Sequence, residues 1–247
     1  MVYEPRSYRK LYGSKDLSHF QVRLVETDLA ISVDKGLSIQ ELAVITLECV
    51  DRYRRLLEKY IGDYPEFLTT LEPFEPLGQV NSAILAMCEA ARLAGVGPMA
   101  AVAGLISEKC GSLLARYSDN VIVENGGDIW LKTKTVRQIA VFAGNSPFTY
   151  RIALEIGPEQ TPLGICTSSG TVGHSLSIGK ADAAVILAPS AVLADAVATA
   201  TCNMVQKEDD LQKAAEFALS VPGVTGALVI LGDKMAVLGQ VKLVPLS

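Results

Sequence analysis

The sequence predicts an α+β fold in which a mostly antiparallel sheet is covered by helices. Short apolar segments follow one another across brief polar turns, longer segments repeat apolar residues at helical spacing, and 49% of the 247 residues are hydrophobic. A chain of this length and composition can bury a full core without disulfide bonds or a structural metal. We expect one domain over residues 1–247.

The first part of the chain is predicted to form a hairpin and a long helix. Residues 7–34 are typical of strands, with Phe20–Val25 and Leu29–Val33 alternating about a turn near residues 26–28. Ser38 offers an N-cap, with Glu41 three positions later, and apolar residues then recur at helical spacing until Gly62. The other face of this helix carries ordinary solvated charges: Glu48, Asp51, Arg52, Arg55, Glu58 and Lys59.

A connector with little regular structure is predicted near residues 64–78, because three prolines fall there. Two largely apolar helices follow, over residues 81–93 and 98–114, and both are expected to be buried. Small residues in the second helix permit the close approach of a neighbouring helix, or of a ligand at the helix start.

From Asn120 onward the pattern changes to short strands, at residues 121–123, 138–142, 150–154, 164–166 and 183–187. Helices are predicted over residues 190–206 and 208–219. A hairpin over residues 227–238, turning at Gly232, closes the fold.

Composition restricts the partners. The net charge is −5 and the basic residues are not gathered in one segment, which excludes a nucleic-acid footprint. No secretion-signal pattern and no uncharged apolar run of bilayer-spanning length occur, so we expect a cytoplasmic protein without a membrane partner. The five cysteines are widely spaced and indicate neither a disulfide framework nor a zinc site; Cys166 is interpreted as an inert strand thiol, with a reactive thiol as the alternative.

The segment 166–175 concentrates hydroxyl groups, glycines and one of the two histidines. Hydroxyls and glycine-exposed N–H groups can surround an anion without a basic side chain, so a phosphorylated small molecule is predicted to bind there. The residues concerned are Thr167, Ser168, Ser169, Gly170 and Thr171.

Histidine changes charge near neutral pH, which makes His174 the candidate general acid or base, or a phosphate-binding residue. A serine hydrolase is disfavoured, because the Gly-x-Ser-x-Gly elbow is absent and no third triad member can be named.

A second motif, residues 124–128, ends an apolar strand with two glycines between acidic and amide side chains. Glycine permits both close backbone approach and positive φ, so Asn125, Gly126, Gly127 and Asp128 are predicted to contact the ligand, Asp128 foremost. A plain hairpin turn is the alternative, but acids between two apolar stretches require partners.

A third motif places Asp195 and Thr199 four residues apart in a predicted helix, so that carboxylate and hydroxyl share one face. Mg²⁺ is bound by one or two carboxylates, waters and substrate phosphates, which fits a site with few acids. In the plainer alternative, Asp195 stabilises the first turn of its helix and Thr199 bonds its own backbone.

The order of these motifs resembles the ApbE family, flavin transferases that hydrolyse FAD and attach FMN to a threonine or serine of a target protein with Mg²⁺. In that family a helix rich in small residues precedes an Asn-x-Gly-Gly-type turn, a Thr-Ser-Gly loop with a following histidine, and a helix of the form Ala-Asp-Ala-x-x-Thr. The matching segments here, within residues 95–206, are 98–111, 125–128, 167–170 with His174, and 194–199.

The resemblance implies a T-fold-like arrangement, Asp195 and Thr199 as ligands of Mg²⁺, and FAD or a related nucleotide as the bound molecule. It implies a magnesium-dependent flavin transferase or FAD pyrophosphatase with an acceptor protein as partner. The apolar small-residue helices would also suit a homodimer.

A different function is implied by one departure from the family pattern. The lysine that commonly follows the alanine-rich helix start is not found at residues 102–104. The alternative is a non-catalytic binding or accessory protein, since the chain looks most like a smaller ApbE-like branch of anaerobes and archaea linked to sulfide assimilation into homocysteine.

Overall fold

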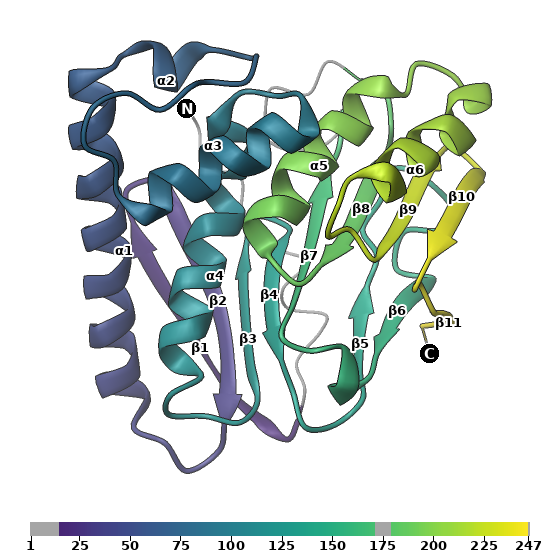
Figure 1. Ribbon diagram of the computed structural model, residues 1–247. Coiled ribbons are helices and arrows are strands. Elements are labelled where there is room, and N and C mark those ends of the chain that lie inside the picture. Colours follow the sequence, from purple (N-terminus) through teal and green to yellow (C-terminus); the bar gives the residue numbers. More distant parts are fainter. Residues whose placement is uncertain (1–14, 171–178, 247) are drawn as a thin grey trace.

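The computed structural model describes residues 15–170 and 179–246, and within them an eight-stranded antiparallel sheet carries helices on one face (Figure 1). The strand order is β1-β2-β3-β4-β7-β8-β9-β10. A smaller antiparallel sheet has the order β11-β6-β5. The predicted α+β fold, an antiparallel sheet covered by helices, is therefore confirmed.

The elements begin and end as follows. The strands are β1 Leu17–Leu24, β2 Thr27–Asp34, β3 Val121–Asn125, β4 Asp128–Lys132, β5 Arg137–Ala140, β6 Ile152–Ile156, β7 Leu163–Ser168, β8 Ala183–Ala188, β9 Gly226–Leu231, β10 Lys234–Gly239 and β11 Leu243–Pro245. The α-helices are α1 Ile39–Asp63, α2 Glu66–Thr69, α3 Ser82–Ala94, α4 Val102–Leu114, α5 Ala191–Met204 and α6 Leu211–Ser220. A 3₁₀ turn, Pro98–Ala101, precedes α4.

The hairpin β1–β2 and helix α1 form as predicted; residues 7–14 of the predicted strand region lie outside the described residues. Ser38 is the N-cap of α1, and its hydroxyl accepts a hydrogen bond from the N–H of Glu41. The connector after α1 differs from the prediction in one respect, because it contains the one-turn helix α2. Phe67 on α2 packs edge-on against Tyr60 and Phe74, which holds this segment on the core.

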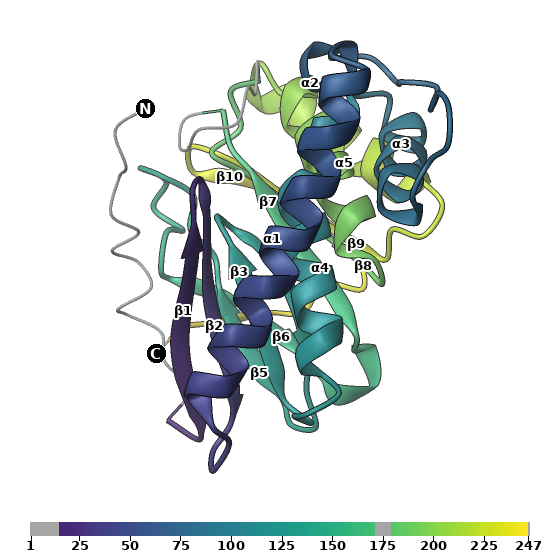
Figure 2. The same ribbon diagram turned by 90° about the vertical axis from the view of Figure 1, so that its left-hand side faces the viewer.

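Both faces of the large sheet are covered. The helices pack on one face, as Figure 2 shows for α1 and α4 beside β1–β3, and the buried residues between them form the larger core. A second core, which includes Leu131, Leu154 and Ile165, lies between the opposite face and the small sheet. Strand β8 has no exposed residue, since each of its faces meets a core.

Helix α5 lies against α4 and β7 at a distance that only glycine permits. A Cβ atom on Gly104 of α4 would stand 2.2 Å from the carbonyl oxygen of Ala191, and one on Gly164 of β7 would stand 2.4 Å from the Ala191 Cα. Glu108 of α4 fixes the start of α5, because its Oε2 accepts hydrogen bonds from the Ser190 hydroxyl and the Ala191 N–H, each 2.8 Å long. The position of α5 is thus set by backbone contact.

Two strands were not anticipated from the sequence. The segment 128–132 forms β4, paired with β3 and β7, and residues 243–245 form β11 on the small sheet. Of the helices that the structure describes, none is long and apolar enough on its own to cross a membrane. Only α3 and the segment Pro98–Leu114 pass that test together, as a pair bent by 106°.

Replacing Gly104 with alanine is expected to lower the free energy of unfolding by about 2 kcal/mol, because the added methyl group overpacks the contact with α5. The matched control is Gly62→Ala in α1, where nothing lies within 4 Å of the new Cβ and a gain of about 0.5–1 kcal/mol is expected. Urea unfolding of both variants measures the difference. Equal stability of the two variants would contradict this account of the α4–α5 contact.

Candidate functional site

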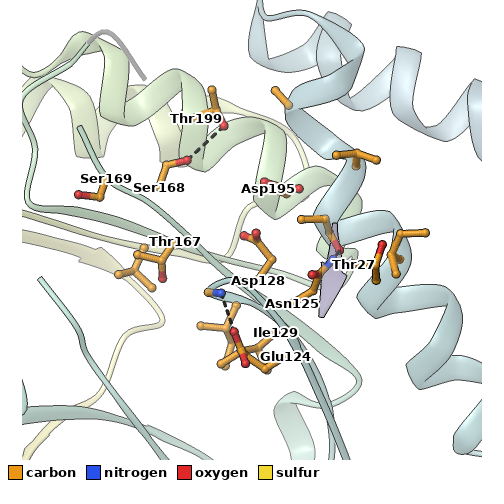
Figure 3. Close-up of a pocket in the computed structure, with 18 of the residues that line it drawn as sticks. Thr27, Glu124, Asn125, Asp128, Ile129, Thr167, Ser168, Ser169, Asp195 and Thr199 are labelled. Atoms are coloured by element: carbon orange, nitrogen blue, oxygen red, sulfur yellow. Dashed lines mark hydrogen bonds between the residues drawn. The ribbon is translucent and has the colours of Figure 1, made fainter. Parts of the chain in front are cut away.

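A cavity of about 920 Å³ opens beside the turn between β3 and β4. Its walls come from the β1–β2 turn, α1, the start of α4, the β3–β4 turn, the end of β7 and α5, with the small sheet on its apolar side. Figure 3 shows the polar side chains at one end of it, on β3, β4, β7 and α5. Chain segments from residue 26 to residue 199 therefore contribute to one site.

The β3–β4 turn is the two-residue hairpin turn of Gly126 and Gly127, whose φ angles are +70° and +106°. The turn is stabilised by the Glu124 carboxylate, which accepts a 2.8 Å hydrogen bond from the Gly127 N–H. The hairpin-turn alternative is correct for the backbone, but the flanking Glu124, Asn125 and Asp128 are buried. Asn125 donates from its side-chain amide to the Ala103 carbonyl at 3.3 Å, which ties the turn to the start of α4.

Two buried carboxylates, those of Asp128 and Asp195, face each other at the wall of the cavity (Figure 3). Each residue is 7% exposed. Asp195 Oδ2 accepts a 2.7 Å hydrogen bond from the Gly104 N–H, and Asp128 accepts one from the Thr167 N–H. Asp128 Oδ1 is buried and has no hydrogen-bond partner among the described residues.

Burial raises the pKa of both carboxyl groups. It raises the pKa of Asp195 to about 7, against the opposing effect of hydrogen bonds from the Gly104 and Ala103 N–H groups. Burial and the neighbouring Asp195 charge raise the pKa of Asp128 well above its ordinary value. The pair is therefore costly in its fully ionised form unless a cation is present.

Thr199 lies one turn beyond Asp195 on α5, and its hydroxyl is 3.2 Å from that of Ser168 on β7. The plainer alternative from the sequence is wrong on two points. Asp195 is not in the first turn of α5, and its carboxylate accepts a hydrogen bond from Gly104 of α4. The hydroxyl of Thr199 is hydrogen-bonded to that of Ser168. Both side chains line the cavity.

Cys166 lies beneath this pair on β7 and is fully buried. Burial and the charges of Asp128 and Asp195 raise the pKa of its thiol well above the ordinary value. Its Sγ contacts the Ala191 carbonyl at 3.4 Å. The interpretation as an inert strand thiol agrees with this environment, because the thiolate is strongly disfavoured there.

The structure brings together most of the residues predicted to bind the ligand. Those that line the cavity are Asn125, Gly126, Gly127, Asp128, Thr167, Ser168, Ser169, Asp195 and Thr199. Gly170 does not line it, and its N–H donates to the Ala181 carbonyl at 2.9 Å. Thr171 and the candidate acid or base His174 lie outside the described residues.

Other residues that line the cavity were not singled out from the sequence. Among them are Thr27 and Arg54 near the β1–β2 turn, Met99 before α4, and the stacked rings of Phe142 and Tyr150, whose centroids are 5.3 Å apart. None of these residues stands in a recognisable motif. The docking of hairpin, helix and small sheet on one another brings them to the site.

The oxygen atoms at the polar end fit a hard cation. No group of three or more His, Cys, Asp or Glu side chains that could hold a metal occurs in the part of the chain that the structure describes. Two carboxylates, one of which has an oxygen without a partner among the described residues, and two hydroxyls do gather there. This set suits Mg²⁺, which keeps waters and accepts ligand oxygens, better than a cation that needs a closed protein cage.

The antiparallel sheet, its helical layer and a cavity walled by the Asn-Gly-Gly-Asp turn and the Ala-Asp-Ala-Val-Ala-Thr helix together define an ApbE-like protein. A family model described as "AbpE bacteria" matches residues 9–237, and the chain belongs to this family. The UPF0280 protein of Methanococcus aeolicus is 37% identical over 228 residues, which are 90% of each chain. That of Methanocella arvoryzae is 42% identical over 200 residues, 79% of this chain and 80% of the relative.

Solved structures agree with this assignment at the level of the fold. The flavinyl transferase ApbE of Pseudomonas stutzeri, in its apo form, matches 90% of this chain and 95% of its own, with a TM-score of 0.54 at 14% identity. The ApbE protein of Thermotoga maritima matches 90% and 96%, with a TM-score of 0.56 at 15% identity. The expected ApbE-like fold is confirmed.

The metal-free protein is expected to lose stability through Asp195 as the pH rises from about 4 to about 7. Asp195 has its ordinary pKa of 3.8 in the unfolded chain and a pKa of about 7 in the folded chain. Between these values the folded state holds a proton that the unfolded state has released, so rising pH favours unfolding. The contribution is on the order of 4 kcal/mol.

Unfolding of the wild type and of Asp195→Asn at pH 4 and pH 8, with EDTA present, measures this contribution. Asparagine keeps an oxygen that accepts from the Gly104 N–H, so the variant removes the charge and leaves that hydrogen bond. A stability difference between the two proteins that is the same at both pH values would contradict the expectation.

Proposed function

We propose that this protein binds a flavin nucleotide, FAD or a close relative, together with Mg²⁺, and acts on the diphosphate of that nucleotide by cleavage or transfer. The observation that carries the proposal is the pair of buried carboxylates, Asp128 and Asp195, at the wall of a large cavity. Membership of the family and the flavinyl transferase with the same fold support the choice of a flavin.

Asp195 and Thr199 would hold the metal ion, with Asp128 Oδ1 as a further oxygen donor. When bound, Mg²⁺ supplies positive charge to the phosphoryl oxygens, whose negative charge grows during cleavage. Asp195 is already fixed for this role, because the N–H of Gly104 holds one of its oxygens. The hydroxyl of Thr199 is hydrogen-bonded to that of Ser168 on β7, 3.2 Å away.

The residues around this pair would hold the rest of the nucleotide. Thr167 and Ser169 line the cavity and would contribute hydroxyl groups, and the glycines of the β3–β4 turn allow a ligand to approach the backbone. His174 is proposed to position or protonate the leaving group, and Thr171 to add a hydroxyl. The cavity volume of about 920 Å³ is within the range of about 300–1,000 Å³ common for cofactor sites.

The first experiment is calorimetric titration with FAD, with and without Mg²⁺, followed by analysis for released AMP and FMN. Magnesium-dependent binding with release supports the enzyme. Binding without release favours the accessory protein, which is the alternative suggested by the absence of a lysine at residues 102–104. No binding of FAD under either condition would refute the proposed function.

Asp195→Asn is expected to weaken magnesium-dependent FAD binding at least tenfold, about 1.4 kcal/mol, because the metal loses a charged ligand. The matched control is Asp209→Asn, which changes an exposed acid in a salt bridge with Lys207 away from this site. Titration of FAD at fixed Mg²⁺, and of Mg²⁺ alone, gives both affinities. If the Asp195 variant kept both affinities, the metal site would have to be assigned to other residues.

A further inference from the structure

The cavity is strongly acidic, and one basic residue lines it. Among the described residues in its wall, five are acidic: Glu26, Glu58, Glu124, Asp128 and Asp195. Arg54 is the single lysine, arginine or histidine in that set. An anionic ligand that enters this cavity therefore meets one permanent protein cation.

Arg54 bridges two elements at the wall of the cavity. It lies on α1, and its Nη2 is 2.8 Å from Glu26 Oε2 in the β1–β2 turn and 3.4 Å from Glu58 Oε1 on α1 itself. Its Nη1 is 3.5 Å from the hydroxyl of Thr27. The arginine side chain is 20% exposed, so it is largely buried in the wall and not free in solvent.

The position of Arg54 is close to the proposed phosphate site. Thr27 follows the β1–β2 turn on β2, and Leu29, two residues later, pairs with Asn125 at the end of β3. Figure 3 shows Thr27 beside Asn125, with the Asp128 and Asp195 carboxylates next to them. The Arg54 guanidinium, next to Thr27, therefore lies at the polar end of the cavity, on the side of the β1–β2 turn.

The present partners of Arg54 can be exchanged for a ligand. The side chains of Glu26 and Glu58 are 71% and 63% exposed, and water stabilises such carboxylates almost as well as an ion pair does. A guanidinium has five N–H donors in a planar fork that matches two phosphate oxygens at once. A phosphate group would therefore compete well for it.

We propose that Arg54 is the anion-recognition residue of the cavity and binds the diphosphate of the nucleotide on the side facing the β1–β2 turn. This inference rests on the proposed function, because it assigns the phosphate groups of that ligand. Arg54 makes the site selective for phosphorylated flavins over riboflavin, which has the same ring system but no phosphate group.

The test compares Mg²⁺-FAD and riboflavin as ligands of the wild type, Arg54→Met and Arg54→Lys. Arg54→Met is expected to weaken FAD binding at least tenfold and riboflavin binding less than twofold, because it removes the charge and keeps the length of the side chain. Arg54→Lys is expected to lie between wild type and Arg54→Met, since an ammonium group offers charge without the fork.

The matched control is Arg55→Met. Arg55 is the next residue of α1, is 76% exposed and pairs with Asp51, so its loss is expected to leave both affinities unchanged. Circular dichroism melts of all four proteins check that the fold is retained. The proposal is overturned if Arg54→Met binds FAD within twofold of wild type, or if it loses riboflavin and FAD equally.

Failure of the proposed function gives a different result. If the wild type binds neither flavin, titration with Mg²⁺ and inorganic pyrophosphate tests Arg54 alone. A tenfold loss of pyrophosphate affinity in Arg54→Met, but not in Arg55→Met, supports anion recognition by Arg54. No pyrophosphate binding, or equal binding by the two variants, overturns it.

Discussion

The close approach of α5 to α4 and β7 determines where the site can form. Gly104 and Gly164 leave no room between their backbones and that of Ala191, and Glu108 holds the first N–H groups of α5. One turn further along α5, Asp195 consequently meets the N–H of Gly104. A carboxylate in this position belongs to the contact between two helices, and a change in their packing moves it directly.

The acidic character of the cavity bears on how a charged ligand can enter it. Among the described residues of its wall, three acids outside the buried pair outnumber the one guanidinium, and the resulting negative potential concentrates cations and repels free anions. A nucleotide that carries its own divalent ion, or that follows one into the cavity, avoids this repulsion. The fold tolerates the buried acids because backbone N–H groups and protonation lower their cost while no ion is bound.

Patterns within one segment were predictable from the sequence, and contacts between segments were not. The N-cap at Ser38 and the apolar spacing after it predicted α1 to within one residue at each end. Strand β4 was missed because its apolar run is only three residues long, 129–131, and the acid and glycines before it were interpreted as a ligand-binding motif. Asp195 and Thr199 share one helix face by their spacing and were singled out by the family resemblance, and both line the cavity. Arg54 escaped notice, since nothing in α1 distinguishes it from the solvated Arg52 and Arg55 until the β1–β2 turn is docked beside it.

The way the cavity is assembled also affects how the protein can be studied. Its walls come from the first hairpin, α1, the β3–β4 turn, β7 and α5, which are separated by up to 173 residues between Glu26 and Thr199. A ligand bound there would contact elements from both halves of the chain. Because it would bind the native and not the unfolded state, its binding energy would add to the stability of the whole native state. Ligand-dependent thermal shifts would therefore report binding to the native state, and a panel of phosphorylated compounds could be ranked without any assay of turnover.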